Sequence, residues 1–419
     1  MKNASGAAGL LPWLRRNIWS LAVLALAALL FVGLRLSLRE EPSEQALPGD
    51  YAEYEKGVVV DILTDSTFSD EAADGGYRGE QMMLVDVKSG QYAGEQLLVY
   101  NYVGPLYGVP VQEGDGVSLI ISTYSDGRHM ATVFEYNRIP ALLLVVALFF
   151  AVTILVGRKT GAKSLLALVI TVLCLFYILL PLLLRGAPTL LTVFLTCVYI
   201  TVVSFVILGG VERKSLCAMA GTVAGTAIAL LFALLAQRLC RISGLRVSDV
   251  EPLLQLRQTG TPIGLRNLLV AGVVISALGA VMDVAMSISS SLEEVHAANP
   301  ELGFSRLFRS GMNIGQDLVG TMTNTLILAF LGSSFTLILY LYSLGLSRYQ
   351  LLPSAYLAIE VISGVSSSVG MILSIPLTAA VSALWLDKGL LRGRAAPEPQ
   401  SVPAPAKSSP APKKKGKGK

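Results

Sequence analysis

Long apolar runs recur along the chain and predict helices that cross a membrane. A helix needs about 20 predominantly apolar residues to span the hydrocarbon core of a bilayer. Segments of this kind lie at roughly 18–37, 139–157, 164–184, 189–209, 215–237, 266–290, 317–342 and 354–385. The pattern therefore predicts a polytopic α-helical membrane protein with about eight transmembrane helices.

The polar segment between the first two spans has a different pattern. Residues 38–138 contain short runs in which apolar and polar positions alternate, separated by glycine-containing turns. The runs are GVVVDIL, QMMLVDVKS, EQLLVYNYV, GVSLIIS and ATVFEYN. Five such strands over about 80 residues predict a small β-barrel of the OB type.

This β-domain is interpreted as an outer cap or an assembly surface, with ligand capture as the alternative. Barrels of this type that bind nucleic acid combine a basic groove with aromatic platforms. The first half of this domain is instead acidic, with Glu53, Glu55, Asp61, Asp65, Asp70, Glu71 and Asp74. Nucleic acid is therefore not an expected partner.

The two ends of the chain are predicted to differ from the seven-span helical part, residues 139–385. Residues 1–17 place Lys2, Arg15 and Arg16 before the first span, as in a signal peptide, but no small-residue cleavage site follows. An uncleaved signal anchor over 18–37 is the better interpretation. Residues 386–419 have the proline, alanine and lysine composition of a disordered basic tail.

Charge and composition refine this topology. Only 15% of the 419 residues are charged and 53% are hydrophobic, whereas soluble domains have about 25% charged residues. Lysine and arginine in the short loops favour cytoplasmic N- and C-termini and an extracytoplasmic β-domain. A basic cluster between residues 238 and 266 opposes that orientation and leaves the topology of this connection open.

Acidic side chains occur inside each of the last three predicted spans, at Asp283, Asp317 and Glu360. Residues three, four and seven apart share one face of a helix, and each carboxylate shares its face with hydroxyl or amide side chains. The resulting candidate pathway residues are Asp283, Ser287, Ser290, Asp317, Thr321, Asn324, Glu360, Ser363 and Ser367.

These polar faces favour a pathway for a cation or for a solute coupled to one. A carboxylate at the bilayer centre costs about 2.5–3.5 kcal/mol, so such groups usually face a cavity or a partner. Carboxylate, hydroxyl and amide oxygens are hard ligands that suit H⁺, Na⁺ or Mg²⁺. The alternative is hydrogen bonding between helices, worth about 0.6 kcal/mol per bond. Asp317 has a further alternative, as a residue at a helix end that interacts with the helix dipole.

Three other patterns lie in the same region. DVAMSISSS at 283–291 and EVISGVSSS at 360–368 form a short repeat, which predicts two parallel spans in equivalent positions. Pro376, with the glycines before it, predicts a break in the last span. Two glycine pairs spaced for close helix contacts are Gly221 with Gly225 and Gly311 with Gly315.

Two rival classes of function are considered beside a secondary transporter or channel. An intramembrane hydrolase is a weak alternative, because the two histidines, His129 and His296, lie outside the spans and neither aspartate sits in a G-x-G-D motif. We therefore expect neither an enzyme nor a cofactor, and the metal preference stays unknown. A non-transporting scaffold that displays the β-domain is the second rival, and a homo-oligomer is left open.

Three long stretches resemble the YibE/F family of bacterial multi-pass membrane proteins. They are TPIGLRNLLVAGVVISALGAVMDVAMSISSSLEEV, NPELGFSRLFRSGMNIGQDLVGTMTNTLILAFLGSS and AIEVISGVSSSVG, and the likeness covers roughly residues 40–385. The resemblance implies a protein of the bacterial cell membrane, with the lipid bilayer as its surroundings. It implies no substrate, reaction or site residues, so the candidate pathway rests on the helix faces alone.

Overall fold

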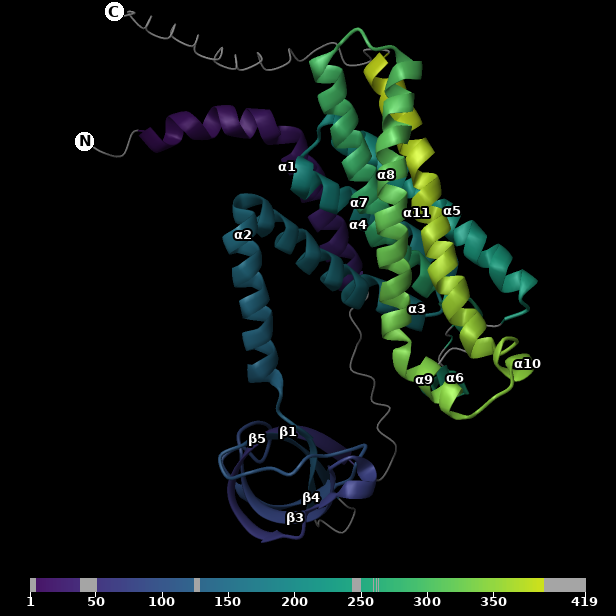
Figure 1. Cartoon of the computed structure of the whole chain (residues 1–419). Coiled ribbons are helices and arrows are strands. Elements are labelled where there is room, and N and C mark those ends of the chain that lie inside the picture. Colours follow the sequence, from purple (N-terminus) through teal and green to yellow (C-terminus); the bar gives the residue numbers. More distant parts are fainter. Residues whose placement is uncertain are drawn as a thin grey trace, which may run out of the picture. The chain divides into compact units, whose positions relative to one another are not determined.

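The computed structural model describes the protein over residues 5–37, 51–123, 129–242, 250–258, 260, 262 and 264–387 (Figure 1). The chain divides into two compact units. One comprises Val32–Val169, and the other comprises Met1–Phe31 together with Ile170–Lys419. The predicted basic tail lies outside the described residues from position 388 onward.

The smaller unit contains a closed β-barrel. Its strands are β1 (Tyr51–Asp65), β2 (Phe68–Asp70), β3 (Gly76–Val87), β4 (Gln96–Val103), β5 (Gly116–Thr123) and β6 (His129–Tyr136), with a 3₁₀ turn, η1, at Glu71–Ala73. The order β1-β5-β6-β4-β3 closes because β1 also pairs with β3, and β4 and β6 pair in parallel. The five predicted strands are therefore confirmed as a five-stranded barrel. Strand β2 was not predicted, because three residues are too few to show an alternating pattern of apolar and polar positions.

The barrel core combines an apolar interior with one buried polar network. Valine, leucine, isoleucine and methionine side chains such as Met83, Val99 and Leu119 fill the interior. Beside them, the buried Gln81 side chain accepts from Asn101 Nδ2 at 2.9 Å and from the Val111 backbone N–H at 3.0 Å. Gln81 Nε2 also donates to the Val111 carbonyl at 3.1 Å. This network holds the loop between β4 and β5 against the barrel.

The first helix after the barrel, α2 (Ile139–Cys174), turns back on itself at Arg158 (Figure 1). Arg158 has φ 48° and ψ −128°, a conformation that an L-residue adopts only under strain. Gly161 makes the turn feasible, because a Cβ there would lie 2.2 Å from the Thr153 carbonyl oxygen. The apolar segment Ile139–Leu184 has 46 residues, about 69 Å of helix against a hydrocarbon core of about 30 Å. Its length therefore suits the two predicted crossings, 139–157 and 164–184, rather than one.

The end of that segment changes helix type before the chain leaves it. A π-helical turn, η2, occupies Leu175–Leu179 and is followed by the short helix α3 (Leu180–Leu184). Pro181, at the start of α3, has no N–H to donate to the preceding turn. The wider turn keeps the backbone helical up to Leu184.

The larger unit is a helical bundle (Figure 1). Its main helices are α1 (Ser5–Ser37), α4 (Thr189–Gly209), α5 (Arg213–Leu239), α7 (Leu268–Ala298), α8 (Phe304–Ser333) and α11 (Ala355–Asp387), with the shorter α6 (Val250–Gln258), η4 (Leu265–Asn267), α9 (Phe335–Ser343) and α10 (Arg348–Leu351). Helices α5, α7 and α11 pack on one another, α8 packs on α11 and α7, and α4 packs on α5 and α7. Helix α1 joins α4 through a hydrogen bond from Tyr199 Oη to the Ala27 carbonyl, 2.9 Å long.

Both predicted glycine pairs lie at close helix contacts. A Cβ on Gly225 would lie 2.6 Å from Ser374 Cβ, and one on Gly221 would overlap Thr378. A Cβ on Gly315 would likewise overlap Ile375. Small residues therefore allow the backbones of α5 and α8 to approach α11 directly, as small-xxx-small spacing predicts.

The structure corrects three expectations about the last spans. The seventh predicted span, 317–342, begins much earlier, because α8 starts at Phe304, runs to Ser333 and then bends by 59° into α9. The sixth continues to Ala298 instead of ending near residue 290. The last span is not broken, since α11 continues as one helix through Pro376, whose lost hydrogen bond is tolerated where neighbouring helices enclose it.

The helices fit a multi-pass membrane protein. Among the described residues, six helices are long and apolar enough to cross a bilayer, or seven when α8 and α9 count as one bent span. The total of eight crossings and the orientation of the termini stay predictions.

Candidate functional site

The polar face predicted around Asp283 lies on the side of α7 that this chain does not cover. Asp283 is midway along α7, and both it and Ser287 are exposed, while Ser290 is half-buried. Gly272 and Gly279 belong to the same face, and a Cβ added at either would meet nothing within 4 Å. The face is therefore open among the described residues, and it extends further than the sequence analysis recognised.

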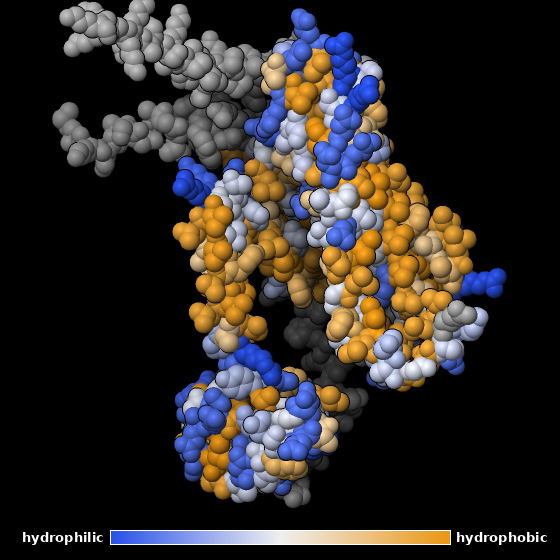
Figure 2. Space-filling view, in the orientation of Figure 1, coloured by the Kyte–Doolittle hydropathy of each residue, from blue (hydrophilic) through white to orange (hydrophobic). Residues whose placement is uncertain are grey.

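The second predicted face lies on α8 and is also exposed. Asp317, Thr321 and Asn324 all point away from the side of α8 that packs on α11. Asn313 extends the face by one turn toward the helix start. Figure 2 shows this as blue and white residues among orange ones over α8. Because α8 begins at Phe304, Asp317 lies in mid-helix, and the alternative of a residue at a helix end is wrong.

The heights of these side chains along the bundle follow from contacts with α11. Helix α7 runs parallel to α11, with Ser276 Oγ 3.4 Å from Ser367 Oγ. Helix α8 runs antiparallel to α11, with Gly315 against Ile375. These contacts place Ser276 level with Ser367, and Gly315 level with Ile375. The heights of the other residues follow by counting along each helix from these contacts.

The same count places the two aspartates at one level. Asp283 lies seven residues beyond Ser276 and is level with Ser374, while Asp317 is level with Leu373. The two carboxylates thus lie within about one helical turn, ~5 Å, of the same height. Glu360 lies 14 residues before Ser374 on α11, which is about 21 Å of helix rise away. The three acids therefore lie at two heights, with Asp283 and Asp317 near mid-bundle and Glu360 near the start of α11.

The remaining candidates on α11 face the helix packing rather than an open side. Ser367 is buried, and its hydroxyl donates to the Val273 carbonyl of α7 at 3.4 Å. Ser363 is half-buried and donates to the Ile359 carbonyl of its own helix at 2.9 Å. Ser367 thus joins two helices, which is the hydrogen-bonding role considered as the alternative to a pathway.

The hydroxyls on α7 and α8 keep their oxygen lone pairs available. Ser287 Oγ donates to the Asp283 carbonyl at 2.8 Å, and Thr321 Oγ1 donates to the Leu318 carbonyl at 3.2 Å. A hydroxyl that donates its proton to its own helix still presents two lone pairs. No ion pair or hydrogen bond joins the carboxylates of Asp283, Asp317 or Glu360 to another described residue. These oxygens could therefore serve as ligands for a cation or as proton acceptors.

Two limits of the sequence patterns emerge from this geometry. The repeat at 283–291 and 360–368 does not mark equivalent positions, because the contact register offsets α7 and α11 by 91 residues rather than 77. Within the described ranges, no three His, Cys, Asp or Glu residues gather as a metal-ligand cluster. Any cation bound at the aspartates would therefore rely on hydroxyl and amide oxygens as well.

The fold and the polar faces define a class: a multi-pass helical membrane protein with a small β-barrel domain. A family model described as YibE/F-like protein matches residues 145–388, more than half of the chain. The chain belongs to the YibE/F-like family, as the sequence resemblance indicated. The match covers the helical part from within α2 onward and leaves the barrel outside it. No curated protein and no solved structure matches the chain.

Proposed function

We propose that the protein provides a route across the membrane for a cation, or for a solute coupled to one, along the polar faces of α7 and α8. It would act as a secondary transporter or a channel. The observation that carries this proposal is the pair Asp283 and Asp317, which are level with each other, exposed, and unpartnered among the described residues.

The carboxylates of Asp283 and Asp317 require a counter-charge or a proton. An ionised carboxylate facing lipid at mid-membrane is unfavourable, so such groups are neutralised or face water or a partner. A cation or proton beside each carboxylate is a favourable solution, because a carboxylate lowers the energy of a positive charge nearby. Ser287, Thr321 and Asn324 supply neutral oxygens on the same faces, and these suit a hard cation.

Glu360 has a separate role in this proposal. Its position near the start of α11, about 21 Å of rise from the aspartates, places it toward one mouth of the route. A carboxylate at a mouth raises the local concentration of cations without holding them. Ser363 and Ser367 then belong to the packing of α11 rather than to the ion's coordination.

A scaffold without transport is the rival supported by a specific observation. Gly272 and Gly279 leave open space along α7, and a stripe of small residues is also what a second helix needs in order to pack closely. In that case a partner would cover the face, and Asp283 would be satisfied by hydrogen bonds across the interface.

Cation-dependent thermal stability tests the proposal on the full chain in lipid nanodiscs. Unfolding is followed against pH and against Na⁺, K⁺, Mg²⁺, Ca²⁺ and Mn²⁺. A ligand at about 100 times its dissociation constant stabilises the folded state by ~2.7 kcal/mol. Asp283→Asn and Asp317→Asn should each lose the response. Glu301→Gln, which removes an exposed carboxylate from the turn before α8, should keep it.

The outcomes separate the two candidate functions. A response of the wild type to one cation, absent in both asparagine variants, supports the route, and flux of that cation into proteoliposomes then measures transport. If no cation or pH change alters stability, and both variants are merely less stable than Glu301→Gln, the aspartates hold the structure together and the scaffold is favoured.

A further inference from the structure

Helix α8 carries a polar face that the rest of the described bundle leaves exposed. The α8 polar face consists of the side chains of Asn313, Gln316, Asp317, Thr321 and Asn324, all of them exposed. From its first to its last residue it covers about 16 Å of helix rise, more than half of a hydrocarbon core of about 30 Å. Helix α8 is long and apolar enough to cross a bilayer only together with α9.

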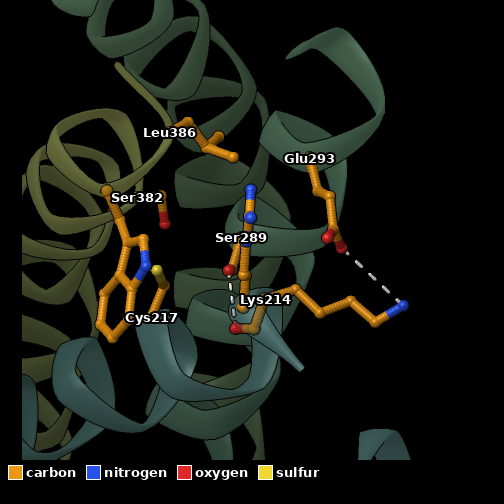
Figure 3. Close-up of a pocket in the computed structure, with 8 residues that line it drawn as sticks. Lys214, Cys217, Ser289, Glu293, Ser382 and Leu386 are labelled. Atoms are coloured by element: carbon orange, nitrogen blue, oxygen red, sulfur yellow. Dashed lines mark hydrogen bonds and ion pairs between the residues drawn. The ribbon is translucent and has the colours of Figure 1, made fainter. Parts of the chain in front are cut away.

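These side chains need partners that lipid does not supply. Unpaired polar groups are costly in the bilayer core, and a carboxylate there usually faces water or a partner. In the part of the chain that the structure describes, no hydrogen bond joins the α8 polar face to another helix. Near the end of α7 the situation differs: Figure 3 shows Glu293 facing Lys214, with 3.9 Å between Glu293 Oε2 and Lys214 Nζ. The α8 polar face is therefore incomplete in a single copy of the chain.

The exposed surfaces of the other described helices do not match this face. At mid-helix, α4, α5 and α11 expose apolar side chains such as Leu195, Leu231 and Leu373. Helix α2 exposes mainly leucine, valine and phenylalanine, and its Thr153 hydroxyl already donates to its own helix. The polar face around Asp283 belongs to α7, which already packs on α8 through apolar side chains.

The α8 polar face is, however, complementary to itself. Carboxamide side chains such as those of Gln316 and Asn324 both donate and accept hydrogen bonds. When two copies meet across a two-fold axis, the same surface is used on both, so each amide can meet an amide. A two-fold axis along the membrane normal also keeps both copies in the same orientation in the bilayer.

We propose that a second copy of this chain packs against the α8 polar face and forms the missing wall of the route. The contact brings the Asp317 carboxylates of the two copies to one height, where a cation or a proton between them offsets their charge. Each copy thus contributes a carboxylate, while the face of α7 around Asp283 stays open to the enclosed route. The inference deepens the proposed function, on which the role of Asp317 rests, but the contact itself does not require transport.

Disulfide cross-linking in membranes that have never been solubilised tests the contact. Thr321→Cys is made in a Cys240→Ser background, where the remaining cysteines are buried, and is oxidised with copper phenanthroline. Leu231→Cys is the matched control, because Leu231 is 63% exposed on α5. The contacts of α5 and α8 with α11 place it within about one residue of the height of Thr321. Thr321→Cys should give a covalent dimer at least tenfold faster than Leu231→Cys, because only Thr321 lies in the contact.

Single-molecule photobleaching of the full chain in liposomes measures the strength of association. The exposed Cys240 carries one fluorophore per chain, and two-step traces are counted as the protein is diluted in lipid. Replacing both Gln316 and Asn324 by leucine should weaken association by about tenfold or more, because four amides leave the contact. The conservative pair Gln316→Asn and Asn324→Gln keeps both amides and should associate like the wild type.

The outcomes separate this contact from the proposed route. Equal cross-linking of Thr321→Cys and Leu231→Cys, or a Thr321→Cys product whose mass is not that of two chains, would overturn the second copy as the wall. So would a double leucine variant that associates as strongly as the wild type. A fast Thr321→Cys dimer in a protein whose stability responds to no cation would support the contact and refute the route alone.

Discussion

Replacing Gly279 by alanine tests whether the polar face of α7 is open to its surroundings. A Cβ at Gly279 would meet nothing within 4 Å. The matched substitution, Gly225→Ala, adds the same methyl group at a contact between helices. There it would lie 2.6 Å from Ser374 Cβ and 2.8 Å from Val281 Cγ1, distances at which atoms must move apart.

The expected changes in the free energy of unfolding have opposite signs. Alanine is favoured over glycine inside a helix by about 1 kcal/mol, and Gly279→Ala should gain about that amount. Gly225→Ala gains the same term but adds an overpacking cost of about 1–3 kcal/mol. The net effect at Gly225 should be a loss of up to about 2 kcal/mol, so the two variants should differ by about 1–3 kcal/mol.

Buried thiols provide the assay. Cys174, Cys197 and Cys217 are buried, whereas Cys240 is exposed. In a Cys240→Ser background, a fluorogenic maleimide reacts only as the bundle opens, and the midpoint of a thermal ramp in nanodiscs reports its stability. The Gly279→Ala midpoint should rise above that of the background protein, and the Gly225→Ala midpoint should fall.

A lower midpoint for Gly279→Ala would refute the open face. It would mean that a partner, such as a second copy, packs against α7 and has no room for a methyl group. A Gly225→Ala variant as stable as the background protein would instead refute the close contact between α5 and α11.

Two further predictions concern the barrel. Gln81→Leu removes the acceptor of the Val111 N–H and should speed the hydrogen exchange of that amide in the full chain by tenfold or more, because a lost buried hydrogen bond costs about 1–3 kcal/mol. Gln112→Leu, at an exposed position in the same loop, should leave the exchange of Val111 unchanged. Equal exchange rates in the two variants would contradict the network. Hydrogen bonds from the Thr67 hydroxyl and backbone N–H, and from Gln81, lower the pKa of Asp65. Because the folded-state pKa is the lower one, this stabilisation is complete above about pH 3.9 and is lost as the pH falls through the folded-state value. Asp65→Asn should therefore show a shallower loss of barrel stability than the wild type as the pH falls below about 4. The same amide exchange measures this loss, and parallel curves for the two proteins would contradict the assignment.

Sequence patterns predicted element types well where the periodicity was long or strict. Alternation over each barrel strand reflects a two-sided strand with one face in the core, and it marked all five long strands. Among the described residues, apolar runs marked each helix that is long and apolar enough to cross a bilayer, because a lipid environment imposes length and composition on each helix separately. Glycine spacing located the contacts at Gly221 and Gly315, since close approach needs a small residue whatever surrounds it.

The ends of the helices and the relative heights of side chains along the bundle could not be predicted from the sequence. The start of α8 at Phe304 was missed because its first turns carry charges, although they continue one unbroken helix. The repeat suggested that Asp283 and Glu360 are equivalent, yet the contact of Ser276 with Ser367 separates them. Helix register depends on which side chains interlock, and no local pattern contains that information.

The sequence by itself determined that this is a multi-pass membrane protein with a small barrel, and which residues share a helix face, because helix and strand periods are local properties of the backbone. Only the tertiary structure decided that Asp283 and Asp317 are level and that Ser367 joins two helices. Those facts arise from packing between helices that are far apart in the sequence, where the fit of small side chains sets the register.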